Sequence, residues 1–486
     1  MTVRLTDLLQ DTPPEAVHTI AGAVERDALL TSSAGLGSLL REVGVEPGRV
    51  VAVMLPDTAV AVVGLFGVWA AAAVHTPLNP RAADREIATS LSLLAPAAIV
   101  TTSDLAERFI SEHSTDELRA GIPVITATDL TWQVARTGDA PTGLVHDPDV
   151  ALVQFTSGTT GTPKPVPMRH STVLDLMDRF IPASDGPRKT PRPNLAPVSL
   201  SLWAGIYQVL FAFRRGAAVI LMDRFETTAF AELVRRFEVR TTVLPPPALT
   251  MLADDESLTD LAPLRTVRSI TAPLSPVQAR RFRDRFGVVV VNSYGQTELG
   301  GQVVGWSAED ERLHSDDKLG SVGRALPGIE LRIDDGEVVV RTPATMGGLI
   351  DPAFRDRLLD GAWFRTGDLG SVDDDGFLWL DGRVSDLINR GGNKVFPAHV
   401  EDVLVTAPNV REAAVVGVAD DRLGEVPWAF VVTRDGRLDE AALLDLCRNQ
   451  LTPYKVPVRI VRIDALPRND VGKVLKRELV VRAAEL

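Results

Sequence analysis

Residues 150–164 read Val150-Ala151-Leu152-Val153-Gln154-Phe155-Thr156-Ser157-Gly158-Thr159-Thr160-Gly161-Thr162-Pro163-Lys164, an apolar run followed by hydroxyls and glycines. The run predicts a buried strand that leads into a loop. Glycines let backbone N–H groups approach an anion, the hydroxyls add donors, and Lys164 adds a positive charge. A surface linker has a similar composition, but the position after a strand favours a triphosphate-binding loop. It is not the P-loop of nucleotide kinases, because Pro163 stands where that motif requires glycine.

Around this stretch, short apolar strands alternate with helical patterns. Strand-like runs include Val50 to Leu55, Ala97 to Val100, Thr241 to Leu244 and Val288 to Val291, and helical patterns include Asp84 to Leu94, Thr228 to Phe237 and Arg280 to Phe286. Such alternation predicts an α/β fold whose large N-terminal domain has layered, mainly parallel sheets.

The texture changes twice toward the C-terminus. Residues 329–383 contain short strands separated by Asp-Gly turns, which predict a small β-rich unit within an N-terminal domain of residues 1–383. Residues 384–486 have their own strands and helices and predict a small, mobile α+β C-terminal domain, called the lid below. A chain of 486 residues is long enough for two such domains.

The composition excludes several classes of function. A net charge of −13 argues against general binding to nucleic acid. Cys447 is the single cysteine, so neither an internal disulfide nor a thiolate metal cage can form. The apolar run Ala59 to Val74 falls short of the ~20 residues that span a bilayer, so a buried helix is expected. The N-terminus lacks the pattern of a signal peptide, and a cytoplasmic location is the expectation.

Four further motifs carry candidate chemistry. Asn292 to Glu298 follows an apolar strand and contains Tyr294, which suits stacking on a purine, and Glu298, which suits Mg²⁺. Trp363 to Asp368 ends in a carboxylate that can accept bonds from ribose hydroxyls. The others are Gly382 to Lys394 and Leu466 to Lys473, each with a lysine on a loop that contains glycine. Individually, Asn292 to Glu298 and Trp363 to Asp368 also suit ordinary turns, and the lysines of the last two motifs also suit exposed, solvated charges.

In this order the five motifs resemble the adenylate-forming superfamily, which includes acyl-CoA synthetases of the AMP-dependent synthetase-ligase type. The resemblance covers nearly the whole chain and is strongest from Val153 to Lys473. It implies that ATP, Mg²⁺ and coenzyme A bind together with a carboxylic acid. It also implies a monomer or homodimer with no membrane span and no nucleic-acid partner.

The resemblance implies roles for individual residues. By this resemblance, the catalytic residues are Lys473, Glu298 and Thr297, and Glu298 is also the metal ligand. The residues that bind the nucleotide and CoA are Thr156, Ser157, Gly158, Thr159, Thr160, Gly161, Lys164, Tyr294, Gly295, Gln296, Asp368, Arg383, Gly391 and Gly392. In the first half-reaction Lys473 stabilises charge at the α-phosphate. The lid then rotates near Arg383, and Gly391-Gly392 helps to form a channel for the thiol.

Three positions depart from the family pattern. Ser385 occupies the hinge, where the family usually has Asp or Lys, and rotation is expected to persist because a hinge needs backbone freedom. Leu202 stands where an aromatic residue or His is common, which places the gate for thioester formation in doubt. Pro165 replaces a common glycine and is expected to stiffen the phosphate loop.

The acid is expected to be apolar. The block before Gly205 lacks the Asp with which relatives pair an α-ammonium group, which argues against a free amino acid. Leu202, Trp203 and Ala272 are expected to form an apolar wall for an aliphatic or aromatic acid, and each also suits ordinary core packing.

Three functions follow as hypotheses. The leading one is an acid–CoA ligase that forms an acyl-AMP and then an acyl-CoA. The alternatives are an enzyme that loads an acyl carrier protein or performs one half-reaction, and a non-catalytic adenylate-binding protein.

Overall fold

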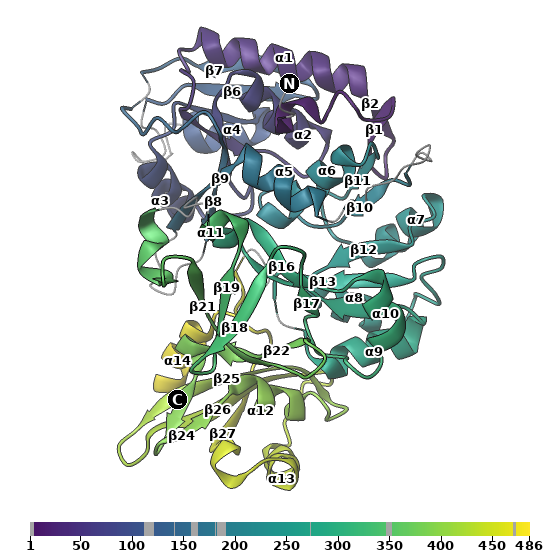
Figure 1. Cartoon of the computed structure of the whole chain (residues 1–486), viewed down its shortest axis with the longest axis vertical. Coiled ribbons are helices and arrows are strands. Elements are labelled where there is room, and N and C mark those ends of the chain that lie inside the picture. Colours follow the sequence, from purple (N-terminus) through teal and green to yellow (C-terminus); the bar gives the residue numbers. More distant parts are fainter. Residues whose placement is uncertain are drawn as a thin grey trace.

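The computed structural model describes residues 4–110, 121–139, 141–156, 164–179, 181, 191–272, 274–346, 352–469 and 473–486. The N-terminal sheets lie at one end of the molecule and the lid at the other, with a β-rich unit between them (Figure 1). The α/β fold class predicted from the sequence is confirmed.

The first sheet has seven strands in the order β7-β6-β5-β3-β4-β8-β9. Its strands are β3 (Val50–Met54), β4 (Val74–Pro77), β5 (Ala98–Thr102), β6 (Val124–Thr128), β7 (Thr131–Arg136), β8 (Val150–Thr156) and β9 (Lys164–Arg169). The five inner strands are parallel, and both edge strands are antiparallel to their neighbours. Its sequence neighbours include the helices α1 (Arg26–Glu42), α2 (Ala59–Ala70), α3 (Asp84–Leu94), α4 (Ser103–Ile110) and α5 (His170–Asp178).

Two smaller sheets complete the N-terminal layers, in the orders β10-β11-β1-β2 and β12-β13-β14. Their strands are β1 (Glu15–His18), β2 (Ala23–Glu25), β10 (Asn194–Ala196), β11 (Val219–Leu221), β12 (Thr241–Leu244), β13 (Thr266–Ser269) and β14 (Val289–Asn292). The associated helices are α6 (Trp203–Arg214), α7 (Thr227–Arg236), α8 (Pro246–Asp254) and α9 (Pro276–Phe286).

The middle of the molecule contains short antiparallel strands. These are β15 (Tyr294–Gln296), β16 (Gly301–Gly305), β17 (Arg324–Ala325), β18 (Glu330–Asp334), β19 (Glu337–Arg341), β20 (Leu358–Leu359), β21 (Trp363–Val372) and β22 (Leu378–Arg383), with helices α10 (Ala308–His314) and α11 (Pro343–Met346).

The lid has a separate five-stranded sheet. It comprises β23 (Ile388–Arg390), β24 (Asn393–Val395), β25 (Val410–Asp420), β26 (Gly424–Thr433) and β27 (Arg459–Arg462), with helices α12 (Pro397–Leu404), α13 (Glu440–Gln450) and α14 (Lys476–Ala484). The lid has hydrophobic clusters of its own, as expected of a separately packed unit.

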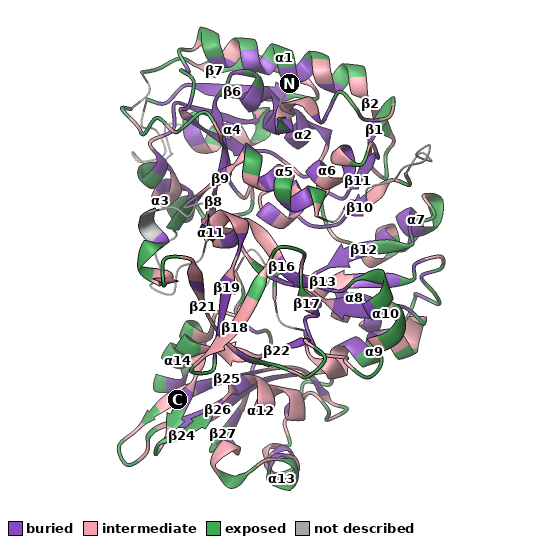
Figure 2. Cartoon of the chain, viewed as in Figure 1, coloured by how far each residue is buried: buried purple, intermediate pink, exposed green. Residues whose placement is uncertain are grey.

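Helix α2 explains the long apolar run. Every residue from Ala59 to Trp69 is buried, and the purple colour of α2 in Figure 2 shows the same. The helix ends at Ala70, Ala72 adopts φ of 56°, and Val74 already begins β4, so the apolar run contains a helix and a strand. In the described ranges, no helix is long and apolar enough to cross a membrane.

Candidate functional site

Asp368 is the centre of a buried polar cluster. It is 8% exposed. Its Oδ2 accepts hydrogen bonds from Tyr294 Oη (2.7 Å) and Gln296 Nε2 (2.8 Å), and its Oδ1 accepts one from Arg383 Nε (3.0 Å). A carboxylate offers roughly four acceptor positions. Three are therefore in use, and a ribose hydroxyl can take the remaining one or displace a donor.

Strand pairing explains this convergence. Asp368 in β21 lies opposite Arg383 in β22, so the two side chains meet across the sheet. The hydroxyl of Thr366 accepts from the backbone N of Asp368 (3.1 Å) and donates to the carbonyl of Val338 (2.6 Å), which fixes the strand at this point.

Tyr294 and Gln296 reach Asp368 from β15, a short strand within the motif Asn292 to Glu298. Between them lies Gly295, where a Cβ would come within 2.1 Å of the carbonyl oxygen of Gly301 in β16. Only glycine permits this close antiparallel pairing. Gly295 therefore serves the backbone here, and the side chains of Tyr294 and Gln296, which share the opposite face of the strand, both reach Asp368.

The cluster is electrostatically coupled. Burial and the negative charge of Asp368 raise the pKa of Tyr294 well above its ordinary value. Burial alone lowers the pKa of Arg383, but the charge and hydrogen bond of Asp368 outweigh it and raise that pKa. Tyr294 thus remains a neutral donor and Arg383 a cation. The tyrosine hydroxyl tethers the carboxylate, a role that the sequence did not suggest.

Lys473 approaches this cluster from the lid. Burial, then the positive charge of Arg383, lower its pKa, while Asp386 and Asp368 act in the opposite direction. Its backbone is held by Asn469, whose Oδ1 accepts from Lys473 N (2.9 Å). Among the described residues, none forms an ion pair or hydrogen bond with its ammonium group.

Thr297 and Glu298 follow β15 in a short 3-10 helix, Thr297–Leu299. Arg357 lies 3.4 Å from Glu298 Oε1 and donates to Gln296 Oε1 (3.3 Å), so it connects Glu298 to the Asp368 cluster. Arg357 also covers the ring of Phe364 at 4.3 Å. Arg357 could not be predicted as a site residue, because it lies outside the five motifs and nothing in the sequence distinguishes it from other arginines.

The phosphate loop is described only at its ends. Thr156 ends β8 and pairs with Lys164, the first residue of the antiparallel β9. The ammonium of Lys164 lies 5.8 Å from the centre of the Phe354 ring. Ser157, Gly158, Thr159, Thr160 and Gly161 lie outside the described residues.

The remaining candidate residues are more dispersed. Gly391 and Gly392 are exposed, and their N–H groups donate to Leu423 O (2.7 Å) and Asn389 Oδ1 (3.1 Å), both within the lid. Trp203 is buried, and a Cβ on Gly301 would lie 3.0 Å from its Nε1. Leu202 and Ala272 are half-buried. The Lys473 charge interacts with Arg383 and Asp368 in this arrangement, whereas the printed hydrogen bonds of Gly391 and Gly392 stay within the lid.

The described side chains offer few ligands for a magnesium ion. Among the described residues there is no group of three or more His, Cys, Asp or Glu side chains that could hold a metal ion. Mg²⁺ commonly uses one or two carboxylates together with substrate phosphates and water. Glu298 alone therefore fits an ion that arrives with a nucleotide.

Family models match most of the chain. Residues 26–350 match the AMP-binding enzyme family, and residues 399–473 match the AMP-binding enzyme C-terminal domain. The chain is 32% identical to 4-coumarate–CoA ligase-like 9 of Oryza sativa subsp. japonica (94% of this chain, 86% of the relative). It is also 32% identical to indoleacetate–CoA ligase of Aromatoleum aromaticum (95% and 92%).

A solved structure is similar over nearly its whole length. It is the o-succinylbenzoate CoA synthetase of Bacillus subtilis in complex with an acyl-adenylate intermediate, at 26% identity, a TM-score of 0.82 and coverage of 98% of this chain and 97% of that one. The chain therefore belongs to the AMP-binding enzyme family.

Proposed function

We propose that this protein is an ATP-dependent acid–CoA ligase that forms an acyl-adenylate and then a thioester. The observation that carries the proposal is that the Lys473 ammonium interacts electrostatically with Arg383 and Asp368, which lie on the other side of the predicted domain boundary, and forms no ion pair among the described residues. A buried cation is costly unless an anion compensates it. A nucleotide phosphate supplies that anion.

In the first half-reaction, a carboxylate oxygen of the acid attacks the α-phosphorus of ATP. A new P–O bond forms, the bond to the β-phosphate oxygen breaks, and pyrophosphate leaves with the electron pair. Such displacements depend on positioning and charge stabilisation more than on covalent help. Asp368 and Arg383 bind the ribose, Thr156 to Lys164 hold the β- and γ-phosphates, and Lys473 stabilises charge at the α-phosphate.

Glu298 and Thr297 complete the phosphate side, with Thr297 directed to the α-phosphate. Glu298 would hold Mg²⁺ with the phosphates, and the ion when bound neutralises phosphate charge. Before the nucleotide binds, Arg357 orients Glu298 and Gln296.

In the second half-reaction, the CoA thiolate attacks the acyl carbonyl and AMP leaves. The lid, residues 384–486, presents Gly391-Gly392 after rotation near Ser385. This boundary is supported by the end of β22 at Arg383 and the start of the lid sheet at Ile388. Ser385 is exposed, and its hydroxyl bonds only the adjacent Asp386 (3.0 Å) among the described residues, so its side chain does not restrain rotation at this position.

The acid is proposed to be aromatic or aliphatic. One relative is named a 4-coumarate–CoA ligase-like protein and another an indoleacetate–CoA ligase, and the candidate residues Leu202, Trp203 and Ala272 are apolar. The test measures pyrophosphate release from ATP with 4-coumarate, indole-3-acetate, o-succinylbenzoate and octanoate, with CoA present or absent. Acyl-CoA formation with at least one acid supports the proposal. Adenylation of an acid without acyl-CoA contradicts it, and acyl transfer to a phosphopantetheinyl carrier protein in that case identifies the alternative.

A further inference from the structure

Asp57 is a buried carboxylate outside the cluster around Asp368. It follows β3, and it is 6% exposed. Its Oδ1 accepts hydrogen bonds from the backbone N of Leu200 (2.6 Å) and from Ser199 Oγ (3.0 Å), two residues far from it in the sequence. Asp57 therefore holds the segment Ser199–Leu202, called the pre-α6 segment because it leads directly into α6.

The same segment is bonded to the strand of the phosphate loop. Ser199 Oγ lies 2.9 Å from Ser201 Oγ, and Gln154 Nε2 donates to the carbonyl of Ser201 (3.2 Å). Gln154 is in β8, two residues before Thr156, where the strand ends. A continuous set of hydrogen bonds thus joins Asp57 to the end of β8.

The pre-α6 segment also fixes Trp203, the first residue of α6. Trp203 packs against Gly301, which lies three residues after Glu298. The turn is tight, since a Cβ on Gly205 would come within 2.1 Å of the carbonyl oxygen of Ser199. A displacement at Ser199 is therefore transmitted to Trp203.

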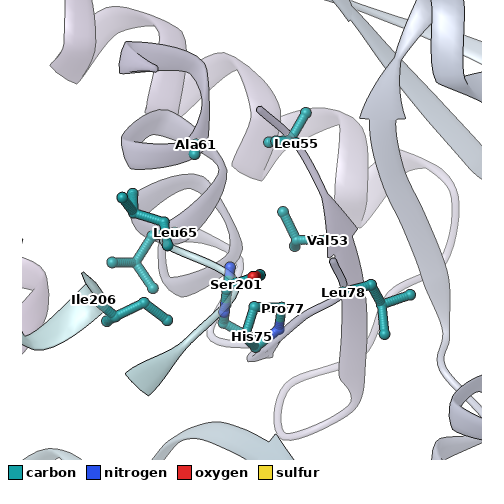
Figure 3. Close-up of a pocket in the computed structure, with 10 residues that line it drawn as sticks. Val53, Leu55, Ala61, Leu65, His75, Pro77, Leu78, Ser201 and Ile206 are labelled. Atoms are coloured by element: carbon teal, nitrogen blue, oxygen red, sulfur yellow. The ribbon is translucent and has the colours of Figure 1, made fainter. Parts of the chain in front are cut away.

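Hydrophobic packing on one side of the segment is incomplete. A small cavity beside Ser201 is lined mostly by apolar side chains, among them Val53, Leu65, Pro77 and Ile206 (Figure 3). Cavity-lining groups lose contacts on the open side. The hydrogen bonds of Asp57 to Ser199 and Leu200, and that of Gln154 to Ser201, consequently have a larger part in holding the pre-α6 segment than they would in a filled core.

Keeping a carboxylate at this position has a cost for folding. Burial raises the pKa of Asp57 to about 6, and the charge of Asp223 adds to the rise. The Leu200 amide, the Ser199 hydroxyl and Arg81 act to lower this pKa but do not outweigh burial. Costly buried ionisable groups gather at functional sites. The cost is consistent with a role in the reaction.

We propose that Asp57 is a positioning residue for acid activation, because it fixes the pre-α6 segment and Trp203 relative to the phosphate-loop strand β8. The proposal rests on the proposed ligase function. It predicts that Asp57 affects the binding of the acid more than the binding of ATP.

The test compares Asp57→Ala, which removes the acceptor, with Asp57→Asn, which keeps an acceptor oxygen and the volume. Asp310→Ala is the matched control, because Asp310 is a similarly buried carboxylate (7% exposed) that caps α10. The probe is whichever of 4-coumarate, indole-3-acetate, o-succinylbenzoate and octanoate gives the fastest pyrophosphate release with the unchanged protein. KM values for acid and ATP are measured well below each variant's Tm.

Asp57→Ala is expected to raise the KM for the acid about ten-fold, as small misplacements near reacting groups do, with the KM for ATP unchanged. Asp57→Asn is expected to restore the acid KM, and Asp310→Ala to lower Tm without altering either KM. An unchanged acid KM in Asp57→Ala, or an equal rise in both KM values, overturns the positioning role. If the unchanged protein releases no pyrophosphate with any of the acids, the ligase proposal itself fails, and the role of Asp57 fails with it.

Discussion

Asp368 and Lys473 meet at one site, but the two regions that supply them hold their charges in opposite ways. Asp368, in the β-rich unit, has three donors and is fixed by strand pairing. Lys473, on the lid, is half-buried near the like charge of Arg383 and forms no ion pair among the described residues. Under the proposed function, Asp368 is a preorganised acceptor for the nucleoside, and a phosphate of the nucleotide is the missing partner of the Lys473 cation. Preorganised charges of this kind stabilise transition states effectively.

The largest effect is expected from Asp368→Ala. It removes the acceptor of Tyr294, Gln296 and Arg383 together, and leaving buried donors unpaired costs about 1–3 kcal/mol each before relaxation. The kcat/KM for ATP should fall by about a hundred-fold or more. The Tm should fall as well. The measurements are pyrophosphate release and thermal unfolding. A catalytic loss with an unchanged Tm would contradict the idea that this side of the site is structurally fixed.

The pH dependence tests the lid side. Because the folded pKa of Lys473 lies below its ordinary 10.5, its charge is lost at lower pH than in the unfolded chain. Adenylation should therefore decline on the alkaline side below pH 10.5. In the same window the unfolded chain binds more protons, so the lysine's contribution to stability rises with pH.

A bound nucleotide should move that alkaline limb. The phosphates favour the charged lysine, so the limb in kcat should lie at higher pH than the limb in kcat/KM, which reports the free enzyme. Lys473→Arg is the control, since an arginine stays charged throughout and should remove the limb. Coincident limbs in both profiles, or a limb that persists in Lys473→Arg, would exclude Lys473 as their source.

Tyr294→Phe separates the hydroxyl from the ring. Losing one neutral donor to Asp368 is worth about 1 kcal/mol, which raises the KM for ATP about five-fold. Tyr294→Leu is the companion variant that also removes the ring. If Tyr294→Phe behaves as the unchanged protein while Tyr294→Leu is impaired, stacking and not tethering is the contribution of Tyr294.

The smallest effect is expected at an ion pair between the lid and the N-terminal domain. Arg434 lies 2.8 Å from Asp254 at the end of α8, and Arg281 shares the same carboxylate. Partly exposed pairs contribute about 0–1 kcal/mol. Arg434→Gln should therefore slow adenylation less than about five-fold. The control is Arg448→Gln, which should have no effect because Arg448 pairs with Asp445 within the lid. If Arg434→Gln and Arg448→Gln slow adenylation equally, the cause is the loss of positive charge on the lid and not the ion pair between the domains.

Periodic segments could be predicted from the sequence. The pattern for Asp84 to Leu94 and for Thr241 to Leu244 gives the bounds found in the structure. The short strands β4 and β15 were missed, because β4 directly follows the apolar run of α2 and ends in a proline, and β15 contains a glycine between two polar side chains. The pairing of each is set by neighbours that are distant in the sequence. The glycine requirement at Gly295, for example, depends on the approach of β16.

The candidate site divides in the same way. Ordered motifs indicated that Tyr294, Asp368, Arg383 and Lys473 serve one function, and the structure brings these four together. The motifs could not show that the Tyr294 hydroxyl is engaged by Asp368, 74 residues away, or that Arg357 connects Gln296 and Glu298. Such contacts follow from tertiary pairing, which a single sequence does not reveal. The roles of Gly391 and Gly392 remain predictions.

The most direct test of the account separates the two half-reactions in Lys473→Ala. One assay measures acyl-AMP formation from ATP and the acid, and the other measures thioester formation from supplied acyl-adenylate and CoA. The account predicts that acyl-AMP formation falls about a hundred-fold or more, while thioester formation from the supplied adenylate is retained. Acyl-AMP formation at the unchanged rate would contradict the claim that the lid supplies the cation for acid activation.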